Sequence, residues 1–337
     1  SAQRRQYGLS LIELMISLLL AALVLLGVVV LFQQSKSTAL QDEQVARMQE
    51  NGRYALRVLS RELAMMNYFG GMIDVPANDQ FVLSNTQLTV GTDCNTDWMK
   101  TASTPLGFSD KDGTTDNVAN PSYTCIPNAD IANGTDVVAI KRVGDLAVCQ
   151  FDDDDPPTVE TCNLTAGTAY LFTNVSAGRL YTAANAGDRC DTCPAPVPEV
   201  SSNIRQYMPE IFFIRPNSSG SDGIPSLVRE TLVGTSMQAQ VLVEGIEDMQ
   251  IEWGIDGTDT DLAPDYYTDN PTGTELSQAV TARVFLLLRS VNPVTGYVND
   301  KSYNLGRKAV AAKNDAFYRR VYATTVQLRN SEMLQMS

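Results

Sequence analysis

The residues that could do chemistry are six cysteines and several carboxylate clusters, and the 337-residue chain has no histidine. Cys190 and Cys193 form a CxxC motif, which in a thioredoxin-like unit is a redox pair at the start of a helix. Here the motif lies in the stretch AGDRCDTCPAPVPEV, where no helix is predicted. We therefore favour a structural disulfide between these cysteines over the redox-active pair of a membrane-anchored enzyme. The missing histidine excludes Ser-His-acid and Cys-His catalysis, and without a second CxxC zinc is disfavoured. We predict no enzymatic activity, no cofactor and no metal.

Three acidic runs supply carboxylates of the kind that Ca²⁺ prefers. They are DKDGTTDN at 110–117, FDDDDPP at 151–157 and DGTDTD at 256–261. None has the spacing of an EF-hand loop with its terminal Glu. Solvated loop tips are the favoured interpretation, and calcium binding stays open.

The cysteines coincide with the most acidic part of the chain. The net charge is −14, of which 67–200 carries −12, whereas 1–66 carries +2 and 201–337 carries −4. Such acidity argues against a nucleic acid partner. Short strand-like runs are predicted in 71–200, at 81–90, 136–149, 168–173 and 179–181. They lie between long polar stretches and bury little apolar surface, so three disulfides are expected to stabilise this region. Fifteen connectivities exist, and nearest-neighbour pairing is favoured: Cys94–Cys125, Cys149–Cys162 and Cys190–Cys193.

The N-terminal region has the properties of a membrane helix. Residues 14–32 read LMISLLLAALVLLGVVVLF without a charge, which is close to the length that spans a bilayer. Arg4 and Arg5 precede this stretch, and the positive-inside rule places that side in the cytoplasm. Glu13 interrupts the apolar sequence, where a carboxylate is expensive and needs a partner.

The residues around Glu13 form a recognisable motif, Gly8-Leu9-Ser10-Leu11-Ile12-Glu13-Leu14. It resembles the class III signal of type IV prepilins. The resemblance implies that a prepilin peptidase cleaves after Gly8, that Leu9 is N-methylated, and that the apolar segment is retained as an assembly helix. Glu13 would then neutralise an N-terminal amine inside a filament and fix the axial register between subunits. Family members usually have Phe where Leu9 stands.

The helical pattern continues beyond the apolar stretch. Apolar residues recur at helical spacing at Leu40, Met48, Ala55, Leu59, Leu63 and Met66. Gly70-Gly71 supplies a stop signal, so one helix from about Leu9 to Tyr68 is expected. Residues 1–8 before this helix form a leader. The helix itself has a transmembrane and assembly half (9–32) and an amphipathic half (33–70).

The C-terminal region, 201–337, reads as β-strands separated by turns. Strands are predicted at 208–215, 226–232, 238–243, 246–253, 282–291 and 320–328, with a polar connection at 308–318. We expect an antiparallel sheet with one face on the long helix and the other in solvent. Arginines on these strands, among them Arg283, Arg289 and Arg319, are expected on the solvated face. The predicted fold class is α+β, with 71–200 as an acidic, loop-rich β insertion.

The segments VEGIEDMQIEWGID, ARVFLLLRS and YRRVYATTVQLRN resemble the PilW family of type IV pilus minor pilins. This resemblance implies a type IV pilin-like fold and a priming complex at the pilus tip. Implied partners are other minor pilins, the major pilin and a possible large tip adhesin. The implied location is the inner membrane with a periplasmic domain, then the pilus tip at the cell surface. The alternative is a GspJ-type pseudopilin of type II secretion.

Overall fold

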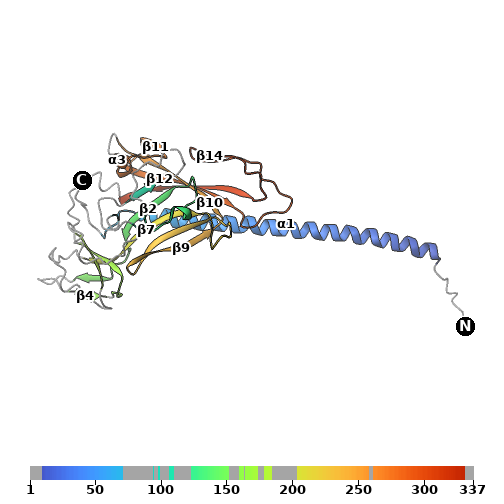
Figure 1. Ribbon diagram of the computed structural model, residues 1–337, viewed down its shortest axis with the longest axis horizontal. Helices are drawn as coiled ribbons and strands as arrows, with labels where there is room; N and C mark the ends of the chain where they lie inside the picture. The colour runs from blue at the N-terminus through green and yellow to red at the C-terminus, as the bar shows by residue number, and fades with distance from the viewer. Residues whose placement is uncertain are drawn as a thin grey trace.

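The computed structural model describes residues 10–70, 94, 98, 106–109, 123–151, 159–162, 164–173, 178–183, 203–257 and 261–330. The chain begins with a 55-residue helix, α1 (Leu11–Met65), whose first half projects from a globular β-rich part (Figure 1). Among the described residues, the remaining named elements are antiparallel strands and two short helices. The predicted α+β class, with a long N-terminal helix on antiparallel sheet, is confirmed.

The strands form three sheets among the described residues. The first contains β1 (Leu106–Ser109), β2 (Val137–Val143), β3 (Cys149–Phe151), β4 (Val159–Cys162), β5 (Ala169–Thr173), β6 (Gly178–Thr182), β7 (Asn203–Arg215), β8 (Ser226–Val233) and β9 (Ser236–Glu244). The second has the order β11 (Tyr266–Thr268), β10 (Ile246–Ile255), β12 (Ala279–Arg289), β15 (Arg319–Gln327). The third is the hairpin of β13 (Tyr303–Leu305) and β14 (Lys308–Val310). The short helices are η1 (Asn128–Asp130) and α3 (Gly273–Ser277).

The long strand β7 organises the first sheet. Its C-terminal half pairs with β2 and β8, and its N-terminal half pairs with β3 and β5. Strands from 71–200 and from 201–337 therefore share one sheet, which crosses the boundary between these two segments.

The amphipathic half of α1 packs between the two larger sheets. Ala55, Leu59 and Leu63 are fully buried and join one core with Phe212 of β7 and Trp253 of β10. The positions predicted for the centre of the helix stripe are buried, as 3.6-residue periodicity requires: Met48, Ala55, Leu59, Leu63 and Met66. Leu56 and Val58, which widen the stripe, are partly buried against the same core. The side chain of Leu40 lies outside the described residues.

Gly245 is the corner at which the chain passes from the first sheet to the second. Its φ of +83° lies in the left-handed region, and a Cβ there would lie 2.8 Å from the Arg289 carbonyl oxygen. Its own N–H and C=O bond to Pro225 and Arg289 on either side. Glycine meets both requirements at once because it has no Cβ.

The predicted single sheet with one solvated face is wrong. Alternate residues of β2 face different cores: Ile140 packs in the core that contains α1, and Ala139 packs in a second cluster with Trp98, Tyr123 and Phe213. The Cys94–Cys125 disulfide holds this second cluster together. A segment attached by a disulfide, which no periodicity reveals, therefore covers the face that was expected in solvent.

Most strand predictions are confirmed to within a few residues. The exceptions have local causes: 136–149 was predicted as one strand, but Gly144 ends β2 and a turn precedes β3. The polar connection at 308–318 contains β14, because Val310 packs with Leu305 and Leu287. The run 81–90 lies outside the described residues.

The Cys94–Cys125 disulfide should contribute strongly to stability. It closes a loop of sequence separation 31, for which the chain-entropy relation gives about 3–4 kcal/mol. We expect Cys94→Ser/Cys125→Ser to lower the free energy of unfolding of the full chain in detergent by that amount, measured by denaturant titration. The unmodified chain under reducing conditions is the comparison. Unchanged stability in the double variant would contradict this role.

Candidate functional site

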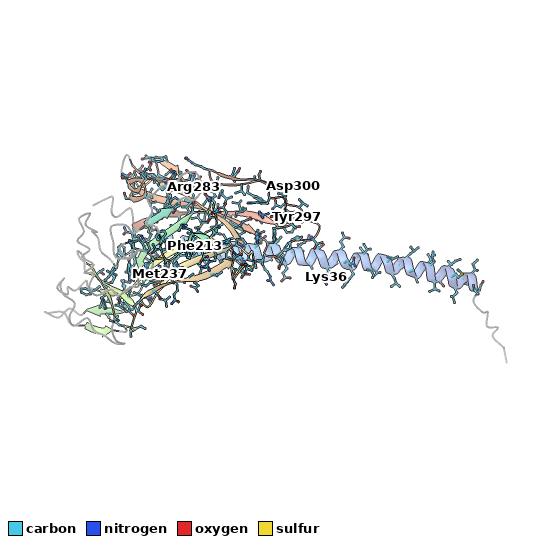
Figure 2. The ribbon with its side chains drawn as sticks, in the orientation of Figure 1. Lys36, Phe213, Met237, Arg283, Tyr297 and Asp300 are labelled. Carbon is cyan, nitrogen blue, oxygen red and sulfur yellow. A yellow bond between two sulfur atoms is a disulfide. The ribbon has the colours of Figure 1, made fainter. Side chains whose placement is uncertain are left out.

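The N-terminal half of α1 is the most unusual surface of the molecule. From Leu11 (79% exposed) to Phe32 (70% exposed), its large apolar side chains project from the helix without contact to the β-rich part (Figure 2). Among the described residues this helix is long and apolar enough to cross a membrane. Twenty-two residues span about 33 Å, close to the thickness of a bilayer core.

Glu13 lies in the first turn of this helix. Ser10 precedes the helix with an extended backbone, and its carbonyl accepts the first helical hydrogen bond, from Leu14 N–H at 3.1 Å. The Glu13 side chain is exposed, as are the apolar side chains around it. Within a membrane-spanning apolar segment a carboxylate is costly and is normally paired with another group. Gly8 and Leu9, the predicted cleavage and methylation residues, lie outside the described residues.

The other half of α1 is held by close packing. Gly52 lies against Leu288 and Tyr322, and a Cβ at this position would approach both side chains to 3.1 Å. At the end of the helix, the Asn330 side-chain amide donates to the carbonyl oxygens of Ala64 (3.4 Å) and Met66 (2.9 Å). These donors satisfy carbonyls that a helix C-terminus leaves unpaired.

A buried ion pair adds a polar contact between helix and sheet. The Arg142 guanidinium of β2 donates from Nε to Glu62 Oε2 of α1 at 2.5 Å, and both side chains are almost completely buried. Glu210 of β7 lies beside this pair and accepts from Arg229 of β8 at 3.1 Å. Two carboxylates and two guanidinium groups therefore meet where the helix contacts the first sheet.

Burial dominates the electrostatics of this cluster. It raises the pKa of Glu210 to about 7, reinforced by the nearby Glu62 carboxylate and opposed by Arg229 and Arg142. Sequence reasoning missed the cluster, because Glu62 and Arg142 are 80 residues apart. One feature of the sequence could have indicated the cluster: the charged Glu62 directly precedes Leu63 of the apolar stripe.

The structure describes Cys94, Cys125, Cys149 and the backbone of Cys162. The predicted Cys94–Cys125 disulfide is confirmed, with Cα atoms 4.3 Å apart. Cys149 is disulfide-bonded, and the backbone register of β3 and β4 places it directly opposite Cys162. The pairings Cys149–Cys162 and Cys190–Cys193 stay predictions, and Cys190 and Cys193 lie outside the described residues.

The acidic run at 256–261 is used within the protein where it is described. Asp256 Oδ2 accepts from Leu262 N–H at 3.1 Å, and Asp261 Oδ1 accepts from Ala263 N–H at 2.9 Å. Within the described ranges no group of three or more potential metal-binding side chains occurs. The runs at 110–117 and 152–155 lie outside those ranges.

Two of the arginines predicted on the solvated face, Arg319 and Arg283, contact other side chains of this protein. Arg319, expected on the solvated face, is buried and bonds to Glu247 and Asp315 with both edges of its guanidinium. Arg283 stacks over the Tyr267 ring, 3.4 Å from its centroid. Both residues therefore stabilise this protein's own fold.

Comparisons with known proteins found two family models that match segments of the chain and a similar solved structure. Residues 211–330 match the family described as type IV pilus-assembly protein W (PilW), and residues 3–29 match the prokaryotic N-terminal methylation motif. A solved type IV-like pilin from Thermus thermophilus is 12% identical, over 85% of this chain and 97% of that chain, with a TM-score of 0.35. No curated protein matches the chain in sequence.

The raised pKa of Glu210 makes a specific prediction. Because the folded state holds this proton up to about pH 7 while an unfolded Glu releases it near 4.5, the unfolding free energy should fall as pH rises between these values. The loss is about 3 kcal/mol for the full shift. Glu210→Gln should remove most of this slope, measured by denaturant titration from pH 4.5 to 8.

The matched control is Glu43→Gln, on the exposed face of α1, which should keep the slope of the unmodified chain. An unchanged pH profile in Glu210→Gln would show that Glu210 titrates normally.

Proposed function

Since the chain is a type IV pilin-like protein of the PilW family, we propose that it is a minor pilin that primes type IV pilus assembly within a tip complex. The observation that carries the proposal is the half-covered helix α1. Its C-terminal half is fixed in the β-rich part, while its N-terminal half exposes apolar side chains that only lipid or other apolar helices satisfy. The work of this protein is assembly rather than catalysis.

Processing and topology follow from the N-terminal motif. A prepilin peptidase removes residues 1–8 after Gly8, and the new terminus at Leu9 is N-methylated. With Arg4 and Arg5 on the cytoplasmic side, α1 spans the inner membrane and the β-rich part lies in the periplasm. Extraction of the helix during assembly then carries the protein to the pilus tip at the cell surface.

Glu13 provides the register for that assembly. In a bundle of apolar helices its carboxylate pairs with the N-terminal amine of Leu9, in its own chain or in a neighbour. Both charges are poorly solvated in such a bundle, so a subunit displaced along the axis would leave them unpaired. The helices associate laterally with other minor pilins and with the major pilin, and the β-rich part is free to present a tip adhesin.

The Glu13 proposal is tested by complementing a deletion strain. Glu13→Ala should leave membrane insertion intact but lower the number of surface pili at least about tenfold, because it leaves a buried amine unpaired, a loss of 3–5 kcal/mol for typical buried pairs. Glu43→Ala, on the exposed amphipathic half, should restore piliation like the unmodified chain. Full piliation with Glu13→Ala would contradict the role of Glu13.

The deletion strain also separates this function from that of a GspJ-type pseudopilin. Loss of surface pili with normal protein secretion supports the minor pilin. Normal pili with defective type II secretion would replace it with the pseudopilin function.

A further inference from the structure

The β-rich part has one end that faces the projecting half of α1. Figure 2 shows Tyr297 and Asp300 at this end, close to the level of Lys36 along the helix. Lys36 follows Phe32, the last large apolar residue of the projecting half, by four residues, or about 6 Å of helix. With the segment up to Phe32 in the hydrocarbon core, Lys36 lies in the headgroup layer, which extends the bilayer by about 5–7 Å on each side. This end of the β-rich part therefore lies within side-chain reach of lipid headgroups.

Two segments form this end of the β-rich part, and we call them the membrane-facing tip: 294–301 and 313–318. Asn299 joins them, because its N–H donates to the Asp315 carbonyl at 2.7 Å and its carbonyl accepts from the Asn314 N–H at 2.9 Å. The Asn299 side chain is completely buried, and its amide donates to the Phe317 carbonyl at 2.9 Å. These contacts within the tip hold its two segments in a fixed arrangement.

The membrane-facing tip exposes an apolar side chain. Val298 is 62% exposed, although it lies between the buried Asn299 and Tyr297, whose ring contacts that of Tyr318 with centroids 4.0 Å apart. A single exposed valine is common on a protein surface. At the depth of lipid headgroups, however, apolar and tyrosine side chains are favoured, because that layer is apolar on one side and wet on the other.

The charge around the membrane-facing tip is opposite in sign to that of the whole chain. Residues 289–301 and 313–320 carry five basic and two acidic side chains, whereas the chain has a net charge of −14. Lys301 and Lys313 are exposed and form no ion pair among the described residues. Lys36 on the neighbouring stretch of helix is also exposed. These ammonium groups complement the phosphates of a lipid surface.

We propose that the membrane-facing tip binds the phospholipid surface from which α1 projects. The ammonium groups of Lys301 and Lys313 contact lipid phosphates, and Val298 packs against the first carbons of the acyl chains. The proposal rests on the proposed function, which places α1 across the inner membrane. Because the tip and the spanning helix belong to one chain, the helix keeps the tip at a high effective concentration beside the lipid, so a weak contact suffices.

A lipid surface fits the membrane-facing tip better than a protein partner does. The lipid that covers the apolar half of α1 ends close to the level of the tip, so a protein bound there would have to displace it. Tyrosine and lysine side chains at a membrane interface are also among the groups that set the tilt and rotation of a spanning helix. The contact therefore fixes the orientation of the β-rich part on the membrane before assembly.

The test places a photo-crosslinking phenylalanine derivative at Val298 of the full chain, reconstituted in vesicles of phosphatidylethanolamine and phosphatidylglycerol. We expect a lipid adduct, identified by mass spectrometry. Lys301→Gln/Lys313→Gln should lower its yield at least about fivefold, since one basic side chain near an anionic surface strengthens binding by about that factor. Vesicles of phosphatidylcholine alone should lower the yield of the unmodified lysines by a similar factor.

The derivative at two other positions provides the controls for position. At Phe32, on the projecting half of α1, it should give a lipid adduct in every variant. At Tyr266 of β11, which is 44% exposed and lies toward the opposite end of the second sheet, it should give none (Figure 1).

The matched control for charge is Arg61→Gln/Arg329→Gln, which makes the same change of net charge at exposed residues near the C-terminal end of α1. Its Val298 adduct yield should stay within twofold of the chain with all four residues unchanged. Retention of the Cys94–Cys125 disulfide in each variant reports on folding. An adduct at Phe32 without one at Val298, an equal yield at Tyr266, or a Val298 yield insensitive to Lys301 and Lys313 would each overturn the proposal.

The two proposals fail in different ways. If deletion abolishes pili and Val298 gives no lipid adduct, only the assignment of the membrane-facing tip fails. If deletion leaves pili intact while the lysine-dependent adduct persists, only the priming function fails.

Discussion

The rest of this structure depends on the unequal burial of one helix. The C-terminal half of α1 lies between two sheets with Ala55, Leu59 and Leu63 fully buried, while the N-terminal half exposes a predominantly apolar surface. Apolar side chains in water are unfavourable by about 25 cal/mol for each Å² of exposed surface, so the exposed half needs lipid or other helices around it. The sheets cannot cover it, because they are fixed to the other half. Helix α1 therefore contributes one half to the core of the globular domain and exposes the apolar side chains of the other half.

Contacts inside the globular part fix the position and rotation of helix α1 against the two larger sheets. Apolar burial supplies most of the stabilisation, but apolar contacts alone are non-directional. Direction comes from contacts that tolerate little displacement: Gly52 against Tyr322, the Asn330 amide on the last carbonyls, and the buried pair of Glu62 and Arg142. The corner at Gly245 orients the two sheets that receive these contacts.

The sequence predicted the parts of this fold that depend on local periodicity. The helix, its buried stripe and the C-terminal strands followed from spacings of 3.6 and 2 residues, and the prepilin motif followed from seven consecutive residues around Glu13. The cover over the second face of β2 and β7 could not be predicted, because Trp98 and Tyr123 lie there in one cluster with the Cys94–Cys125 disulfide, and no periodicity of the sequence encodes that disulfide. The buried charge cluster was also missed, since it joins residues from four elements and no single-element pattern encodes it. Arg319 was predicted on the wrong face because one of its two partners, Glu247, lies 72 residues away in β10.

The ion pair between Glu62 and Arg142 has a consequence for the far end of the helix. A helix turns by about 100° and advances 1.5 Å with each residue, so seating α1 one residue out of place would rotate its entire projecting half by that angle. Glu62 reaches Arg142 at only one rotation of α1 about its axis, and the helix between this pair and Glu13 is continuous. The azimuth of Glu13 around the helix axis is therefore set some 70 Å away, inside the globular domain. The direction in which each apolar face of the projecting half points is therefore fixed by contacts inside the globular domain.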